Sequence, residues 1–154
     1  MKNQLLEIKT TLQILKPVYE VFDAIVNPTK MTNYFISKSS GKMEEGRQVI
    51  WQFPEFNTDV PILVDKIELN KYISFYWKND NLDLLVEITL TPSNSHKTIV
   101  TITEKSRELD EAGLNWLKGN TEGWANFLAC LKAYMEYGIN LRKGAFDFLK
   151  VTVN

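Results

Sequence analysis

Few residues in this sequence offer the chemistry that catalysis at neutral pH most often needs. Histidine occurs once, as His96, in a run of turn-forming residues that begins at Pro92. Histidine is the side chain most often recruited for proton transfer, and one on an outer turn cannot serve an interior pocket. Cysteine also occurs once, as Cys130, and without an activating histidine or helix N-terminus we expect a partly buried structural thiol. We therefore predict no catalytic residue.

One carboxyl group is distinguished by its position. Glu104 follows Val100 and Ile102 at two-residue spacing, so we expect it on the inward side of the same strand. Burial in an apolar pocket would raise its pKa and would let it exchange a proton or bind a ligand hydroxyl. The alternative is a carboxylate at a strand end that reaches water or pairs with a lysine. Asp83 and Glu87 have the outward parity and are expected to be solvated.

Bound cofactors have no support in the sequence. Metal sites need clusters of histidine, cysteine or carboxylates, and one histidine and one cysteine without paired spacing predict no metal site. Nucleotide binding is equally unsupported, because the chain has neither G-x-G-x-x-G nor a Walker-type glycine loop. We expect no metal and no cofactor.

Aromatic residues are the mild excess of this composition, at 12% of the chain. Many of them are expected to point into the space between a sheet and a helix. Large rings leave gaps when they cannot interdigitate, so this set either packs as core or lines a pocket for a hydrophobic molecule. The candidate ligand-binding residues are Trp51, Phe53, Phe75, Trp77, Glu104, Trp124, Phe127 and Tyr134.

A strand and two short helices are predicted at the start of the chain. Four apolar residues, Leu6, Ile8, Leu12 and Ile14, lie at even positions, which is the pattern of a half-buried strand. Pro17 ends that strand and suits the first position of a helix, whose apolar residues recur at i, i+3, i+4 and i+7. Asn27 and Pro28 then predict a cap and a second short helix.

An antiparallel sheet is predicted over residues 41–105, where the apolar period stays near two. Turn-forming residues mark its connections at 70–71, 79–81 and 92–95. Between residues 60 and 69 the apolar residues are Val60, Ile62 and Val64 at even positions and Ile67 and Leu69 at odd ones, so a β-bulge at Asp65 and Lys66 would restore the register. Such a bulge also bends the strand, which lets the sheet wrap around another element.

A long amphipathic helix is predicted over residues 121–141. Its apolar stripe is roughly 120° wide and holds Trp124, Phe127, Leu128, Leu131, Tyr134, Met135 and Gly138. Residues 109–118 are interpreted as a separate short turn or helix. The fold class is therefore α+β: one domain over residues 1–154, with a curved antiparallel sheet wrapped around a long C-terminal helix and two short helices after the first strand.

Charge and hydropathy exclude several partner classes. Eighteen basic residues against nineteen acidic ones give a net charge of −1, and no cluster of like charge favours nucleic acid or a polybasic membrane contact. The apolar runs are far shorter than the ~20 residues of a membrane span, and the first ten residues do not read as a signal peptide. We expect a cytoplasmic protein.

Residues spread over nearly the whole chain carry a family resemblance. They are Pro17, Val18, Val21, Phe22, Ala24, Pro28, Gly46, Phe75, Trp77, Val100, Thr101, Ile102, Thr103, Glu104, Gly123, Trp124, Leu128 and Leu131. With the order of elements, they resemble the helix-grip proteins of the START-like superfamily, which includes the birch-pollen allergen. Within it they resemble the homologues of the activator of heat shock protein 90 ATPase. Tyr34 stands where that branch usually has tryptophan, and Asn70 and Lys71 replace a proline-containing loop.

Three functions remain open at this stage. The first is binding of a small hydrophobic or aromatic molecule between sheet and helix, which we favour over an enzyme. The second, implied by the resemblance, is a chaperone-associated interaction module, although 154 residues leave no room for the further domain that full chaperone binding would need. The third is a cyclase or hydrolase of the same superfamily, for which Glu104 is the only candidate group.

The last segment is a candidate contact surface. Residues 140–149 are expected to extend the helix and then to expose Phe146, Phe148 and Leu149. These side chains would either fold back on the sheet edge or provide a patch for self-association or a protein partner.

Overall fold

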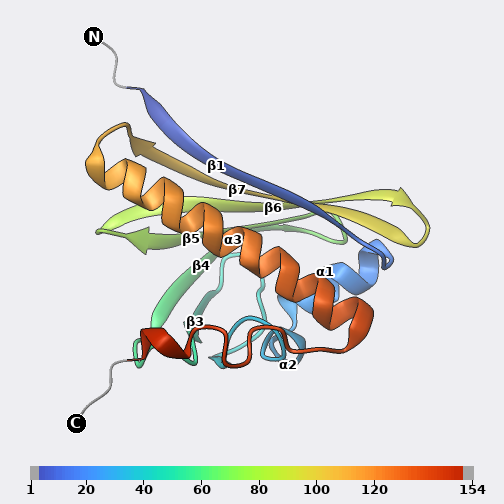
Figure 1. Ribbon diagram of the computed structural model, residues 1–154. Coiled ribbons are helices and arrows are strands. Elements are labelled where there is room, and N and C mark those ends of the chain that lie inside the picture. The colour runs from blue at the N-terminus through green and yellow to red at the C-terminus, as the bar shows by residue number, and fades with distance from the viewer. Residues whose placement is uncertain (1–3, 151–154) are drawn as a thin grey trace.

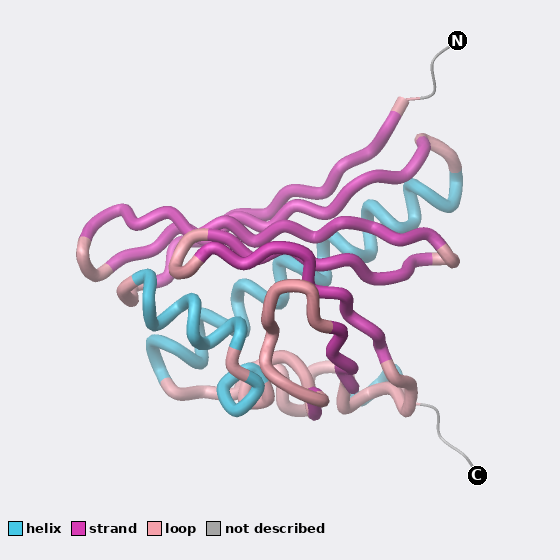
Figure 2. Tube along the Cα trace, turned by 180° about the vertical axis from the view of Figure 1, so that it is seen from behind, coloured by secondary structure: helices cyan, strands magenta, loops and turns pink. Residues whose placement is uncertain are grey.

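A curved sheet and one long helix form the two main layers of the molecule. The computed structural model describes residues 4–150. Its elements are β1 (Leu5–Ile14), α1 (Val18–Val26), α2 (Pro28–Met31), β2 (Lys38–Ser39), β3 (Gln48–Gln52), β4 (Val60–Glu68), β5 (Tyr72–Asn79), β6 (Leu82–Asn94), β7 (Lys97–Glu108), α3 (Glu111–Tyr137) and the 3₁₀ turn η1 (Asp147–Leu149). Helix α3 runs diagonally across one face of the sheet (Figure 1), and the view from behind shows the helices together on that face (Figure 2). This is the α+β arrangement predicted from the sequence.

The sheet is an antiparallel meander with one long-range pairing. Its strand order is β1-β7-β6-β5-β4-β3-β2, so the first strand pairs with the last. The register of β4 against β5 shifts between Val64 and Ile67, which confirms the predicted bulge. The turns after β4 and β5 contain Asn70, Asp80 and Asn81 at positive φ, a conformation that asparagine and aspartate tolerate better than most residues.

The connection between β6 and β7 is tighter than the sequence predicts. Strand β6 continues through Pro92 to Asn94, and β7 begins at Lys97. The register shifts between Pro92 and Asn94, and such an irregularity is a place where a sheet accepts proline. Only Ser95 and His96 remain for the turn.

The short helices follow the expected start signals. The carbonyl of Pro17 accepts hydrogen bonds from the backbone N–H groups of Glu20 and Val21. Pro17 is therefore the N-cap of α1, one position before the first helical residue that the sequence predicts it to be. The side chain of Asn27 accepts from the N–H of Thr29 at 3.1 Å and caps α2. The predicted cap at Asn27 is therefore confirmed.

Helix α3 begins earlier and ends earlier than predicted. It starts at Glu111, because the Asp110 carboxylate accepts from the N–H of Gly113 at 2.7 Å and caps it. A Cβ at Gly113 would lie 2.0 Å from the carbonyl oxygen of Glu108, so glycine permits this close return from β7. The helix ends at Tyr137, where Gly138 adopts a left-handed φ of 65°.

The C-terminal segment turns back instead of extending the helix. After Gly138 the chain runs back past α2 to the side of the molecule where β3 lies (Figure 1). Phe148 and Leu149 are exposed, at 78% and 44%, as the sequence predicts. Phe146 is half-buried, and its ring lies 4.8 Å from the Cζ of Arg142. The tail therefore packs back on the molecule through one of its three apolar side chains.

Candidate functional site

Glu104 is the polar member of an apolar row that crosses the inner face of the sheet. The strand register places it opposite Val86 on β6 and Ile8 on β1, and Val86 lies opposite Phe75 on β5. These residues are almost fully buried, and Glu104 itself is 0% exposed. Glu104 therefore lies on the inner face, as its spacing along the strand predicts.

Three hydrogen-bond donors to Glu104 come from one face of α3. Trp116, Asn120 and Trp124 follow one another at four-residue spacing, which brings their side chains to the same side of the helix. Nε1 of Trp116 donates to Oε2 of Glu104 at 3.0 Å, and Nε1 of Trp124 donates to Oε1 at 2.7 Å. Nδ2 of Asn120 lies 3.2 Å from both carboxylate oxygens.

Trp77 on β5 supplies the fourth donor, with its Nε1 at 3.2 Å from Oε2 of Glu104. An ionised carboxylate is an acceptor only, and each of these four partners donates. None of the partners found among the described residues is a lysine or arginine. The alternative of a carboxylate that reaches water or pairs with a lysine is therefore wrong. The four N–H donors thus satisfy the hydrogen-bonding capacity of the buried carboxyl group.

The carboxylate of Glu104 orients two of the indole rings. Because Glu104 accepts the N–H groups of Trp77 and Trp124, the polar edges of both rings face into the protein. The two ring centroids lie 5.3 Å apart. Their carbon surfaces are thus available to the space beside α3.

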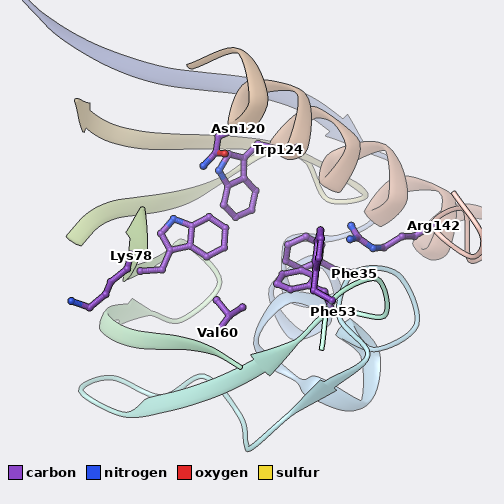
Figure 3. Close-up of a pocket in the computed structure, with 10 residues that line it drawn as sticks. Phe35, Phe53, Val60, Lys78, Asn120, Trp124 and Arg142 are labelled. Carbon is purple, nitrogen blue, oxygen red and sulfur yellow. The ribbon is translucent and has the colours of Figure 1, made fainter. Parts of the chain in front are cut away.

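These two rings help to form a cleft of about 470 Å³, which we call the aromatic cleft. Figure 3 shows Trp124 and Asn120 reaching into it from α3, with Phe35 and Phe53 standing opposite and Val60 below. Its size is within the roughly 300–1,000 Å³ of small-molecule sites. It is lined by Phe35, Phe53, Phe56, Val60, Trp77, Lys78, Asn120, Gly123, Trp124 and Arg142.

The structure separates the sequence candidates into cleft and core. Phe53, Trp77 and Trp124 line the aromatic cleft, whereas Glu104 lies behind two of them. The other four candidates do not line it: Trp51, Phe75 and Phe127 are buried, and Tyr134 stacks on Tyr34 at 5.5 Å. Buried rings meet edge to face, at 5.4 Å for Trp51 with Phe75 and 4.7 Å for Phe35 with Phe127. The centre of the sheet–helix space is therefore packed core.

Several site residues were not found by sequence reasoning. The four-residue spacing of Trp116, Asn120 and Trp124 was a usable signal, but it was lost because residues 109–118 were separated from the long helix. Arg142 gave no local signal. Arg142 lies beyond the helix end, and it reaches the cleft only because Gly138 turns the chain back.

Arg142 joins the C-terminal segment to the loop between β3 and β4. Its Nη2 donates to Oε2 of Glu55 at 2.9 Å, and the two side chains are only 14% and 3% exposed. Its Cζ also lies 5.5 Å from the ring centroid of Phe35 and 5.4 Å from that of Phe53, within cation–π range. Arg142 and Phe35 line both the aromatic cleft and a second hollow of about 560 Å³ under the C-terminal segment.

The remaining reactive groups lie outside the aromatic cleft. His96 is exposed in the β6–β7 turn, at the opposite end of those strands from Glu104. Cys130 is buried, and burial raises the pKa of its thiol. Within residues 4–150, no three histidine, cysteine or acidic residues gather as ligands for a metal ion. The same residues contain no helix that is both long and apolar enough to cross a membrane.

The arrangement of the sheet and α3 defines the class of protein. A curved antiparallel sheet that holds one long C-terminal helix is the START-like, helix-grip arrangement. The family described as Activator of Hsp90 ATPase homolog 1-like protein matches residues 16–136, and the chain belongs to this family. The resemblance noted in the sequence is thereby confirmed. No curated protein sequence matches the chain.

Solved structures agree with this assignment of the fold and the family. A protein from Staphylococcus saprophyticus is 32% identical, with a TM-score of 0.77, over 89% of this chain and 96% of that one. DynU16, a protein of the dynemicin biosynthetic locus, is 22% identical with a TM-score of 0.76, over 86% of this chain and 48% of that one. The Aha1 dimer from Colwellia psychrerythraea is 17% identical with a TM-score of 0.74, over 86% and 98%. The last two likenesses show the fold alone.

Proposed function

We propose that this protein binds a small apolar or aromatic molecule in the aromatic cleft. The observation that carries the proposal is the orientation of the two tryptophan rings that line the cleft. Trp77 and Trp124 direct their N–H groups to the buried Glu104, so their hydrocarbon surfaces face the cleft together with Phe35, Phe53 and Phe56. A concave site with mainly aromatic walls and few polar groups is what small-molecule binding needs.

The residues that line the aromatic cleft favour ligand binding over catalysis. Among the described residues that line the cleft there is no carboxylate, imidazole or thiol. A general acid or base must reach the proton that it transfers, and both oxygens of Glu104 are occupied by donors behind the cleft wall. These observations support a binding protein over the cyclase or hydrolase alternative.

Phe56 offers a direct test of this proposal. It lines the cleft and is 50% exposed. Phe56→Ala therefore removes one aromatic ring from the lining of the cleft and should lower the stability of the fold only slightly. Biphenyl carboxamide, a neutral aromatic probe, should bind the parent in ligand-observed NMR and bind Phe56→Ala roughly three- to tenfold more weakly. Phe148→Ala is the matched control, because Phe148 is exposed outside the cleft. Equal affinities for the parent and Phe56→Ala would refute the proposal.

A second candidate function is binding of a protein partner. The family description names an Hsp90 ATPase activator, and the similar Colwellia structure is a dimer. Tyr137, the last residue of α3, is more than half exposed, as are Ile139 and Leu141 in the segment after it and Phe148. Such apolar surface favours contact with a partner. Sedimentation would detect self-association, and an ATPase assay of purified Hsp90 would detect activation. The Tyr137→Ser/Ile139→Ser variant should weaken either effect.

A further inference from the structure

The charged side chains that line the aromatic cleft are both cations, and each pairs with a carboxylate outside the lining: Lys78 with Asp83 at 3.7 Å and Arg142 with Glu55 at 2.9 Å. Lys78 and Arg142 are the charged side chains among the described residues that line it. Glu55, which pairs with Arg142, lines the neighbouring hollow instead. Glu104 is fully buried and is covered by its indole and amide donors. The cleft therefore presents cations to a ligand and no carboxylate.

Arg142 is the cation that reaches toward the interior of the cleft. Figure 3 shows its side chain extending toward Phe35, whereas the amino group of Lys78 points away from the enclosed space. The rings of Phe35, Phe53 and Phe146 lie 5.5, 5.4 and 4.8 Å from its Cζ. A guanidinium held among rings loses less conformational entropy on binding than a free side chain does. Arg142 is thus already positioned for an incoming ligand.

The guanidinium of Arg142 also keeps an unused donor. Its Nη2 donates to Glu55 at 2.9 Å, but its Nε–H is buried and has no acceptor among the described residues. An unpaired buried donor on a charged group is costly. A carboxylate can accept two parallel hydrogen bonds from such a fork, so a ligand that carries one would relieve this cost.

We propose that the ligand of the aromatic cleft is an aromatic or apolar acid. Its body lies among Trp77, Trp124, Phe53 and Phe56, and its carboxylate accepts hydrogen bonds from Arg142, in competition with Glu55. This inference rests on the proposed function and adds the charge of the ligand to it.

Two probes of equal size separate charge from shape. Biphenyl carboxylic acid and biphenyl carboxamide share one apolar body, but only the acid is ionised at neutral pH. The parent should bind the acid about tenfold more tightly than the amide, since hydrogen bonds to an ionised partner are roughly twice as strong as neutral ones. Isothermal titration gives both dissociation constants, and their ratio is the readout.

Two variants test whether Arg142 causes the preference for the acid over the amide, and both carry the Glu55→Gln substitution. Glu55→Gln removes the competing carboxylate and should increase the preference for the acid. The double variant Glu55→Gln/Arg142→Met has the same net charge as the parent and should bring the ratio close to one. Circular dichroism and the melting temperature establish that both are folded. Glu68→Gln, at an exposed position at the end of β4, matches the charge change of Glu55→Gln and should leave the ratio as in the parent.

The outcomes separate this inference from the proposed function. Equal affinity of the parent for acid and amide would overturn the acid preference while leaving aromatic binding intact. A preference that persists in folded Glu55→Gln/Arg142→Met would overturn the role of Arg142. Failure of the parent to bind either probe would overturn the proposed function, and this inference with it.

Discussion

The indole N–H of Trp124 on α3 donates a 2.7 Å hydrogen bond to Oε1 of Glu104 on β7, twenty residues earlier in the chain. It ties the long helix to the sheet at a fully buried polar position of the core. Trp116, Asn120 and Trp77 donate to the same carboxylate. The geometry of the aromatic cleft thus depends on one buried side chain that lies outside it.

Replacement of Glu104 by glutamine should be strongly destabilising. The glutamine oxygen can accept from about two of the four donors, and its NH₂ group would face the remaining N–H groups. We expect Glu104→Gln to lower the free energy of unfolding by roughly 2–4 kcal/mol in urea titrations. Glu122→Gln, at an exposed position of α3, should cost less than about 0.5 kcal/mol.

The four tryptophans provide an internal control for that experiment. In folded Glu104→Gln, the NMR signals of three indole N–H groups should shift, because Trp77, Trp116 and Trp124 each lose an ionised acceptor. Trp51 lies in the packed core and is not among the donors to Glu104, so its signal should move least. A stability change without these three shifts would contradict the proposed role of the carboxylate.

The sequence predicts those features of the fold that depend on local periodicity. The change of inward parity between Val64 and Ile67 located the bulge, and the two-residue spacing from Val100 placed Glu104 on the inner face. The start of α3 was missed because Gly113 and Gly119 dilute the apolar pattern of its first turns. The capping aspartate at Asp110 was a signal for the earlier start.

The candidate site was harder to predict from the sequence than the fold, because its residues come from distant parts of the chain and meet only in the folded structure. Inward parity cannot distinguish Phe75, which packs in the core, from Trp77, which lines the cleft two residues later. The difference arises from what each ring meets on the opposite layer. Likewise, the contact of Arg142 with Glu55 joins residues 87 positions apart, and no local pattern specifies such a pair.

Two glycines of α3 should respond to alanine with opposite signs. Gly119 lies within the helix with nothing within 4 Å of an added Cβ, so Gly119→Ala should stabilise by roughly 0.5–1 kcal/mol. Gly138 ends the helix at a φ of 65°, so Gly138→Ala should destabilise by about 1 kcal/mol. Thermal unfolding should show shifts of roughly 2–4 °C in opposite directions. Shifts of the same sign would contradict the assigned helix end.

The pair of Tyr72 and Glu87 should make stability depend on pH at both extremes. The Tyr72 hydroxyl donates to Oε2 of Glu87 at 2.6 Å. Burial, and then this hydrogen bond, raise the pKa of Tyr72 to about 12. The bond from Tyr72, with help from Lys105, holds the pKa of Glu87 below its usual value.

The signs of the two effects follow from linkage. A raised tyrosine pKa gives stability that is present below about pH 10, the unfolded value, and is lost as the pH rises toward 12. A lowered glutamate pKa gives stability that is present above about pH 4.3 and is lost as the pH falls through the folded value. Urea titrations of Tyr72→Phe should show smaller losses at both extremes. Exposed Tyr137→Phe is the control, and parallel curves for the parent and Tyr72→Phe would refute the coupling.

The ion pair of Arg142 and Glu55 should decide whether the C-terminal segment stays docked. Arg142→Met leaves the Glu55 carboxylate, 3% exposed, without its cation, and loss of one partner of a buried pair costs roughly 3–5 kcal/mol. Because the segment after Gly138 is held partly by this contact, we expect local release and not global unfolding. Hydrogen exchange of residues 142–150 should accelerate in Arg142→Met, while exchange in β6 and β7 should change little. The double variant Glu55→Gln/Arg142→Met removes both charges, so its exchange should be slower than that of Arg142→Met. Equal exchange in the two variants would mean that the rings around Arg142, and not its charge, hold the segment in place.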